Sequence, residues 1–202
     1  MSKEIEIIFV SENVSKYQEL LEWVNQNNLP LKLTLYKPSQ EIYEVQSLDR
    51  KLIVSEKLLA AYNEFMRHNG LRHITSIDKW LMVEDTSFNI TKLGGFPGPF
   101  VKFYLQSLPL NEIANSNWAS PADAIVSLGI SKICPSGEIV PLVFEGVISG
   151  NIVSPIGNNG FGFDAIFRPS GQNLTYAEMT NNEKSIYSPR IQAFQKVVNY
   201  LC

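Results

Sequence analysis

Two adjacent acids, Glu84 and Asp85, interrupt a run of apolar residues just before a loop rich in glycine and proline. The stretch 81–100 reads LMVEDTSFNITKLGGFPGPF, and residues 79–84 have the composition of a β-strand that would end at these acids. Acids at a strand end are often simply hydrated, because strand ends face water. They can equally serve chemistry at the edge of a sheet. The rest of the chain has to decide between the two interpretations.

A polar loop, SENVSK at 11–16, joins a predicted strand to a predicted helix. The free amides and the macrodipole at a helix N-terminus favour phosphate groups. As a motif this is weak, because Asn13 can be a simple N-cap and Lys16 a solvated lysine of the first turn. The loop is therefore a candidate phosphate site with an ordinary structural alternative.

The stretch NNGFGFDAIF at 158–167 is more specific. Gly160 and Gly162 would let the backbone pass close to a flat ligand, while Phe161 and Phe163 offer aromatic faces and Asp164 an acceptor. Stacking of a nucleobase on such a ring contributes on the order of 1–3 kcal/mol. The alternative is a glycine-rich turn whose phenylalanines belong to the core.

A second group of charges follows in EKSIYSPR at 183–190. Lys184 and Arg190 lie around another predicted helix start, where an anion could be held. Single charges in such places are usually exposed to solvent, and that interpretation also stays open. Ser188 and Pro189 suit the N-cap and first positions of the final helix.

The elements that must position these residues alternate between strand and helix in the first part of the chain, and a predicted hairpin or meander follows. Apolar periodicity predicts strands at 4–10, 31–36 and 79–84, with helices marked by Val14–Val24 and by Leu58–Met66, the second closed by Gly70. Residues 98–108 have a helical pattern with Pro99 near the first turn. Residues 123–133 and 139–150 flank a turn and predict a hairpin or meander, 161–167 predicts a further strand, and 191–201 a final amphipathic helix. The pattern predicts an α/β protein with a mixed sheet and two lobes.

Composition narrows the class of protein. The chain has 202 residues, of which 45% are hydrophobic and 18% charged, so a sizeable core is expected. Cys134 and Cys202 are far apart and have no metal-ligand spacing, which favours a reducing compartment. There is no apolar run of roughly 20 residues, and acids interrupt the apolar N-terminal segment, so we expect a cytoplasmic protein without a membrane partner. A net charge of −3 without a Lys/Arg block argues against a nucleic-acid polymer as partner.

Taken together, these segments resemble the inosine triphosphate pyrophosphatase family over nearly the whole chain. The residues that carry the resemblance are FVSENVSK at 9–16, YEVQS at 43–47, VEDTSFNITKLGGFPGPFVKF at 83–103, NNGFGFDAIF at 158–167 and TYAEMTNNEKSIYSPR at 175–190. The resemblance implies one domain, 1–202, with an elongated mixed β-sheet, flanking helices and two lobes around a central nucleotide-binding cleft. It also implies Mg²⁺-dependent hydrolysis of non-standard purine nucleoside triphosphates (ITP, dITP, XTP) to the monophosphate and pyrophosphate, by a homodimer.

The resemblance assigns roles residue by residue. Glu44 and Asp85 would bind Mg²⁺, or Mn²⁺ in its place, since a hard cation that keeps some waters needs about two protein carboxylates. Asp85 would also activate the attacking water, with Lys16 as a second catalytic residue. Neighbours on a strand point to opposite faces, so Glu84 is not expected to join Asp85. The residues implied to bind substrate are Ser11, Asn13, Lys16, Lys57, Thr86, Lys102, Phe161, Gly162, Phe163, Asp164, Lys184, Ser188 and Arg190.

The sequence departs from the family pattern at two positions. Glu12 replaces a glycine beside the phosphates. A like charge about 4 Å away costs roughly 4 kcal/mol at an effective dielectric constant of about 20, so either Glu12 points outward or the ligand is different. Pro189 replaces a histidine that reads the base, which removes a hydrogen bond worth about 0.5–1.5 kcal/mol. Two alternatives follow: a catalytically weak nucleotide-binding or sensing homologue, and the same pyrophosphatase chemistry with another base preference.

Overall fold

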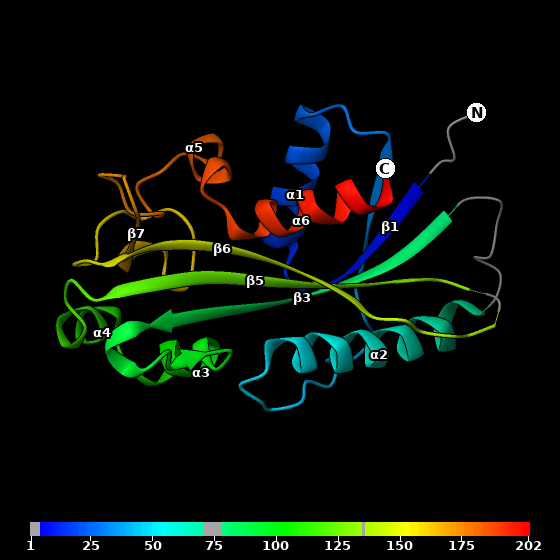
Figure 1. Cartoon of the computed structure of the whole chain (residues 1–202), viewed down its shortest axis with the longest axis horizontal. Helices are drawn as coiled ribbons and strands as arrows, with labels where there is room; N and C mark the ends of the chain where they lie inside the picture. The colour runs from blue at the N-terminus through cyan, green and yellow to red at the C-terminus, as the bar shows by residue number, and fades with distance from the viewer. Residues whose placement is uncertain (1–4, 71–77, 135) are drawn as a thin grey trace. The chain divides into compact units, whose positions relative to one another are not determined.

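The sheet is mixed, with parallel strands from the first part of the chain and antiparallel strands from later parts (Figure 1). In the computed structural model, which describes residues 5–70, 78–134 and 136–202, the strand order is β2-β1-β3-β5-β6-β7, with β4 paired to β3. β1 (Ile5–Val10) is parallel to β2 (Leu31–Tyr36) and to β3 (Asp78–Ile90). β4 (Pro97–Gly98) is antiparallel to β3, and β7 (Phe167–Pro169) is antiparallel to β6 (Leu142–Ile152). The predicted α/β class with a mixed sheet is confirmed.

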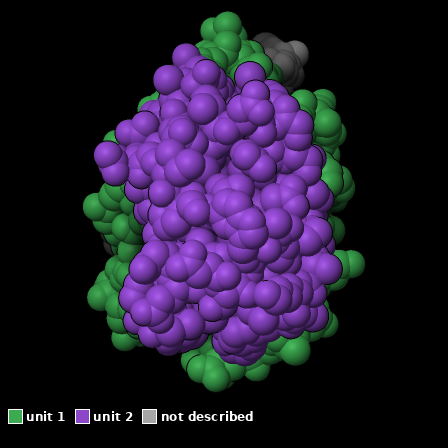
Figure 2. Space-filling model, turned by 90° about the vertical axis from the view of Figure 1, so that its left-hand side faces the viewer, with its two compact units in different colours: residues 1–85, 127–144, 194–202 green, residues 86–126, 145–193 purple. Residues whose placement is uncertain are grey.

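The chain divides into two units, which Figure 2 shows in different colours. Unit 1 comprises Met1–Asp85, Ser127–Phe144 and Phe194–Cys202, and unit 2 comprises Thr86–Val126 and Glu145–Ala193. The boundaries fall inside β3, β5 (Pro121–Lys132), β6 and α6 (Pro189–Leu201), so these elements contribute residues to both units. A nucleotide-binding cleft stays a prediction.

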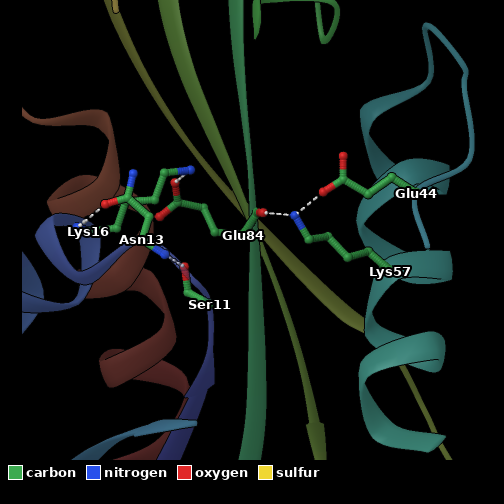
Figure 3. A network of polar contacts seen from close by, with 6 residues as sticks. All are labelled: Ser11, Asn13, Lys16, Glu44, Lys57 and Glu84. Carbon is green, nitrogen blue, oxygen red and sulfur yellow. Dashed lines mark hydrogen bonds and ion pairs between the residues drawn. The ribbon is translucent and has the colours of Figure 1, made fainter. Parts of the chain in front are cut away.

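In unit 1, helices α1 (Val14–Gln26) and α2 (Arg50–Asn69) cover opposite faces of the strands (Figures 1 and 3). The core under α2 joins Val54 and Leu58 to Leu81 and Val83 of β3. On the other side, Trp23 of α1 meets Phe194 edge to face, with ring centroids 5.9 Å apart. Because strand side chains alternate, Asp85 shares the α2 face with Leu81 and Val83, and Glu84 shares the α1 face.

Local capping chemistry sets the helix ends much as the sequence predicts. Asn13 caps α1 through its side chain, and Gly70, with φ of +58°, ends α2. At the start of α6, the Ser188 Oγ accepts a hydrogen bond from the Ile191 amide at 3.3 Å, and Pro189 is the first helical residue. The predicted N-cap and first position of the final helix are therefore confirmed.

Unit 2 is built around a cluster of aromatic rings. Phe88 of β3 stacks on Phe163, with centroids 4.2 Å apart and planes 13° apart, and Phe167 of β7 packs edge-on against both. Three short helices complete the unit: α3 (Val101–Ser107), α4 (Leu110–Ser116) and α5 (Asn181–Ile186). The pattern at 98–108 predicted α3, although the helix begins at Val101 and Pro99 lies in the turn before it. The sequence did not predict helices α4 and α5, and α5 has a single apolar residue, Ile186, so it shows no apolar period.

Two strand predictions were wrong. The strand predicted at 79–84 does not stop at the acids but continues to Ile90, because Phe88 and Ile90 bury their side chains and residues 88 and 89 pair with β4. The strand predicted at 161–167 is a turn and a 3₁₀-helix, Asp164–Ile166, and only Phe167 begins a strand. Gly160 and Gly162 have φ of +84° and +64°, values that no regular strand accommodates.

No helix among the described residues is both long enough and apolar enough to cross a membrane.

Candidate active site

Glu84 and Asp85 lie in the middle of β3, and their side chains lie on opposite faces of the strand. The Glu84 carboxylate is buried, with only 3% of the residue exposed, and its Oε1 lies 2.8 Å from Nζ of Lys16 in α1 (Figure 3). Asp85 lies on the opposite face, toward α2. The acids are therefore not hydrated strand ends. As strand alternation predicted, they lie on opposite faces, and each has its own charged neighbours.

Lys57 of α2 connects the Asp85 face to Glu44. Its Nζ donates a hydrogen bond to the backbone oxygen of Glu84 at 2.8 Å and forms an ion pair with the Glu44 carboxylate (Figure 3). The Glu44 side chain is 51% exposed, so this carboxylate is open to solvent. Glu44, Lys57 and Asp85 thus form one group on the α2 side of unit 1.

Burial raises the pKa of Asp85 from 3.8 to about 6. The ammonium groups of Lys57 and Lys16 lower this pKa, whereas the Glu44 and Glu84 carboxylates raise it further. The Oδ2 atom of Asp85 is buried and has no hydrogen-bond partner among the described residues. A buried carboxylate oxygen without a donor is costly, and it is available to a cation or to a proton.

Two carboxylates of this group could contribute oxygen ligands to a hard divalent cation. The described residues contain no group of three or more His, Cys, Asp or Glu side chains that could hold a metal by themselves. Mg²⁺ usually takes one or two protein carboxylates and completes its shell with waters and substrate phosphates. The partnerless Oδ2 of Asp85 and the solvent-exposed Glu44 carboxylate are such a pair, joined electrostatically through Lys57.

The loop before α1 is held by its own side chains. The Asn13 amide donates to Ser11 Oγ at 3.1 Å, and Asn13 Oδ1 accepts from the Lys16 amide at 3.2 Å, so the N-cap interpretation of Asn13 holds. Lys16 is not a solvated lysine, because its side chain is 19% exposed and paired with Glu84. Glu12 is exposed, as a phosphate site at this loop would require.

In unit 2, Asp164 organises the glycine loop instead of offering a free acceptor. The buried carboxylate accepts a hydrogen bond from the Phe161 amide at 2.8 Å and pairs with Lys184 at 2.6 Å. A Cβ at Gly160 would lie 2.1 Å from Asp164 Oδ2, so a side chain there would collide with this carboxylate. The loop conformation therefore depends on Gly160, Asp164 and Lys184 together.

The two phenylalanines of this loop have different positions. Phe163 stacks in the core on Phe88, so for this ring the alternative of a core phenylalanine is correct. Phe161 is 49% exposed, and the Lys184 ammonium lies 5.6 Å from its ring centroid. Of the two rings, only Phe161 is exposed enough to stack on a ligand.

The remaining predicted residues of unit 2 lie on separate elements. Thr86 is half-buried in β3 and Lys102 is exposed on α3. Ser188 is buried as the cap of α6, and Arg190 is buried in the first turn of that helix. Gly162 has positive φ next to the Asp164 turn. The residue that the sequence did not single out is Glu84, although strand alternation together with Lys16 in the first turn of α1 could have indicated a partner for it.

Known proteins resemble this chain in sequence and in fold. The Ham1 family model matches residues 7–200. The inosine triphosphate pyrophosphatase of Candida glabrata is 30% identical over 97% of this chain and 97% of that protein. The protein of the same name from Schizosaccharomyces pombe is 37% identical, over 60% of this chain and 64% of its own length. Among solved structures, a HAM1 protein from Coxiella burnetii superposes with a TM-score of 0.72 at 24% identity, covering 98% of both chains.

Proposed function

Because the chain belongs to the Ham1 family, we propose that it hydrolyses the non-standard purine nucleoside triphosphates ITP, dITP and XTP to the monophosphate and pyrophosphate. Its similarity to these relatives identifies it as a hydrolase of nucleoside triphosphates, and we propose the specific substrates. The observation that supports it best is the buried Asp85 Oδ2 atom, which has no hydrogen-bond partner among the described residues and belongs to a carboxylate in the field of two lysines and two glutamates of unit 1. A cytoplasmic homodimer belongs to the same proposal.

Glu44 and Asp85 would hold Mg²⁺, with Mn²⁺ as a substitute, and the bound cation would neutralise and orient the triphosphate oxygens. Asp85 is ionised above its pKa of about 6, so near neutral pH it can accept the proton of the attacking water. That water forms a bond to the α-phosphorus while the α–β anhydride bond breaks, and pyrophosphate leaves. A carboxylate with a pKa near the working pH is well matched to this transfer.

Lys16 and Lys57 supply the positive charge that a polyphosphate needs. Both ammonium groups have partners in unit 1: the Glu84 side chain pairs with Lys16, and the Glu84 backbone oxygen accepts from Lys57. Fixed charges stabilise a transition state more than mobile ones, because little reorganisation is needed during the reaction. We therefore assign phosphate stabilisation to this pair.

Base recognition is assigned to residues of unit 2. Phe161 offers an exposed ring, Lys184 lies beside it, and Arg190 occupies the first turn of α6. Pro189 has no side-chain donor, so a contact to the 6-keto oxygen is lost at this position. We expect weaker discrimination between ITP and ATP than a histidine would give. In Pro189→His, the ratio of kcat/KM for ITP to that for ATP should rise about three- to tenfold.

The test is pyrophosphate release from ITP, dITP, XTP, ATP, GTP and modified pyrimidine triphosphates, with Mg²⁺ present. Asp85→Asn should lower kcat at least about 100-fold, because it removes the base and a cation ligand. Asp123→Asn is the matched control, since Asp123 lies on β5 and accepts from Ser149 Oγ away from the cluster. Full activity in Asp85→Asn would overturn the assignment of roles. Tight nucleotide binding without release from any triphosphate would favour a sensing protein.

A further inference from the structure

The Glu84 carboxylate forms an ion pair with Lys16 that the proposed chemistry does not itself require. It is deeply buried, with its side chain 2% exposed, and a buried charge is strongly unfavourable unless a partner compensates it. Lys16 Nζ provides that compensation at 2.8 Å. A strand residue with no direct part in proton transfer thus fixes the position of a lysine assigned to the phosphates.

The backbone of Lys16 is fixed independently of its side chain. Its amide donates to Asn13 Oδ1, and the Asn13 amide donates to Ser11 Oγ. Two hydrogen bonds between residues close in the chain therefore hold the start of α1. With the helix start held at one end and Glu84 holding the ammonium at the other, the side chain of Lys16 spans two fixed points. Few rotamers satisfy both, which lowers the entropy still to be lost when a substrate binds.

Residue 84 also holds the second lysine, through its main chain. The backbone oxygen of Glu84 accepts from Lys57 Nζ at 2.8 Å on the α2 face, while the side chain reaches Lys16 on the α1 face (Figure 3). One strand position therefore sets the location of an ammonium group on each side of β3, next to Asp85. This arrangement depends on β3 continuing past the acids, because a strand end would leave residue 84 free to move.

We infer that Glu84 is a positioning residue, which fixes the Lys16 ammonium against β3 for the polyphosphate while touching no reacting atom itself. The catalytic use of this placement rests on the proposed function, whereas the placement of Lys16 by Glu84 rests on geometry alone. It goes beyond the sequence prediction, which assigned no role to Glu84. Two measurements separate these parts.

The first measurement is lysine labelling, which needs no turnover. An amine-reactive reagent is applied to the native protein, and modification of Lys16 and Lys79 is followed by peptide mass spectrometry. In Glu84→Gln the Lys16 rate should rise about fivefold or more, because the amide cannot hold the ammonium by charge, while the Lys79 rate should stay unchanged. Glu6→Gln is the matched control, since Glu6 is a buried glutamate of the same sheet that pairs with Lys79 at 3.2 Å. It should show the reverse pattern.

The second measurement is kinetic. Glu84→Gln should lower kcat about tenfold or more while KM stays equal or falls, because a negative charge near the phosphates has gone but Lys16 is no longer fixed. Glu6→Gln should leave both constants unchanged. In Lys16→Met/Glu84→Gln, kcat should equal that of Lys16→Met alone, because Glu84 acts through Lys16. Glu84→Asp, which keeps the charge on a shorter stem, should give labelling and kcat values between those of Glu84→Gln and the unchanged protein.

Unchanged Lys16 labelling in Glu84→Gln would overturn the inference whether or not any triphosphate is hydrolysed. So would kcat losses that multiply in the double variant, since they would mean that Glu84 and Lys16 act independently. Wild-type protein that fails to release pyrophosphate, but shows the expected labelling pattern, would refute the proposed function and leave the placement of Lys16 by Glu84 established.

Discussion

The ionised Asp85 carboxylate should lower the free energy of unfolding of the native protein. Replacing it by Asn preserves the shape of a protonated carboxyl group and removes the buried charge. The pKa of Asp85 is raised from 3.8 to about 6, so the folded state favours the protonated form. A raised pKa in an acid means that its contribution to stability is present below pH 3.8 and is lost as pH rises through 6. The free energy of unfolding of Asp85→Asn should therefore exceed that of the unchanged protein by about 3 kcal/mol at pH 8, and the excess should nearly vanish at pH 4.

The assay is urea denaturation of both proteins at pH 4, 6 and 8, in EDTA so that no divalent cation stabilises the native state. Asp123→Asn again serves as control, and we expect no comparable gain from it. A single carboxylate with one buried oxygen that lacks a hydrogen-bond partner among the described residues would then account both for the activity and for a loss of stability. If Asp85→Asn were equally stable or less stable at pH 8, the charge on Asp85 would not be strained in the native state. Asp85 could then not be the tuned base described above.

Three further predictions concern residues outside the Asp85 group. Phe163→Ala should lower the free energy of unfolding by about 3–5 kcal/mol, because it removes a core ring, whereas Phe161→Ala should leave urea stability nearly unchanged and weaken nucleotide binding in calorimetry. Gly146→Ala should destabilise by about 1–3 kcal/mol or more in urea titration, since its Cβ would lie 1.9 Å from the Pro189 oxygen. Burial alone would raise the pKa of Glu6, but hydrogen bonds from Thr34, Lys32 and Lys79 lower this pKa overall. The Glu6 carboxylate should therefore stabilise the fold above its unfolded pKa, and this stabilisation should be lost as pH falls through its folded pKa. In Glu6→Gln the loss of thermal stability on acidification should be shallower, and an unchanged acid limb would contradict this.

Local patterns carried much of the fold. Several local signals depend on residues close together in the chain: the β-rich run of β1, the alternation of β2, the helical spacing in α1 and α6, and the caps at Asn13 and Ser188. Such signals can be read directly from a sequence. Where they failed, a long-range partner decided: the extension of β3 to Ile90 needs β4 beside it. Helix α5 has a single apolar residue, Ile186, so no apolar period could identify it.

The sequence by itself determined which residue types are present for chemistry: the adjacent acids, the capped loop with Lys16, and the glycine loop with Asp164. Only the tertiary structure decided what each does. The FGFD stretch gives no sign that Phe163 enters the core while Phe161 faces solvent, because that depends on Phe88 from another strand. Alternation separates Glu84 from Asp85, but the packing of α1 on one face and α2 on the other assigns Lys16 to Glu84 and places Lys57 and Glu44 beside Asp85. Charges act through space, so their partners are fixed by packing and not by order along the chain.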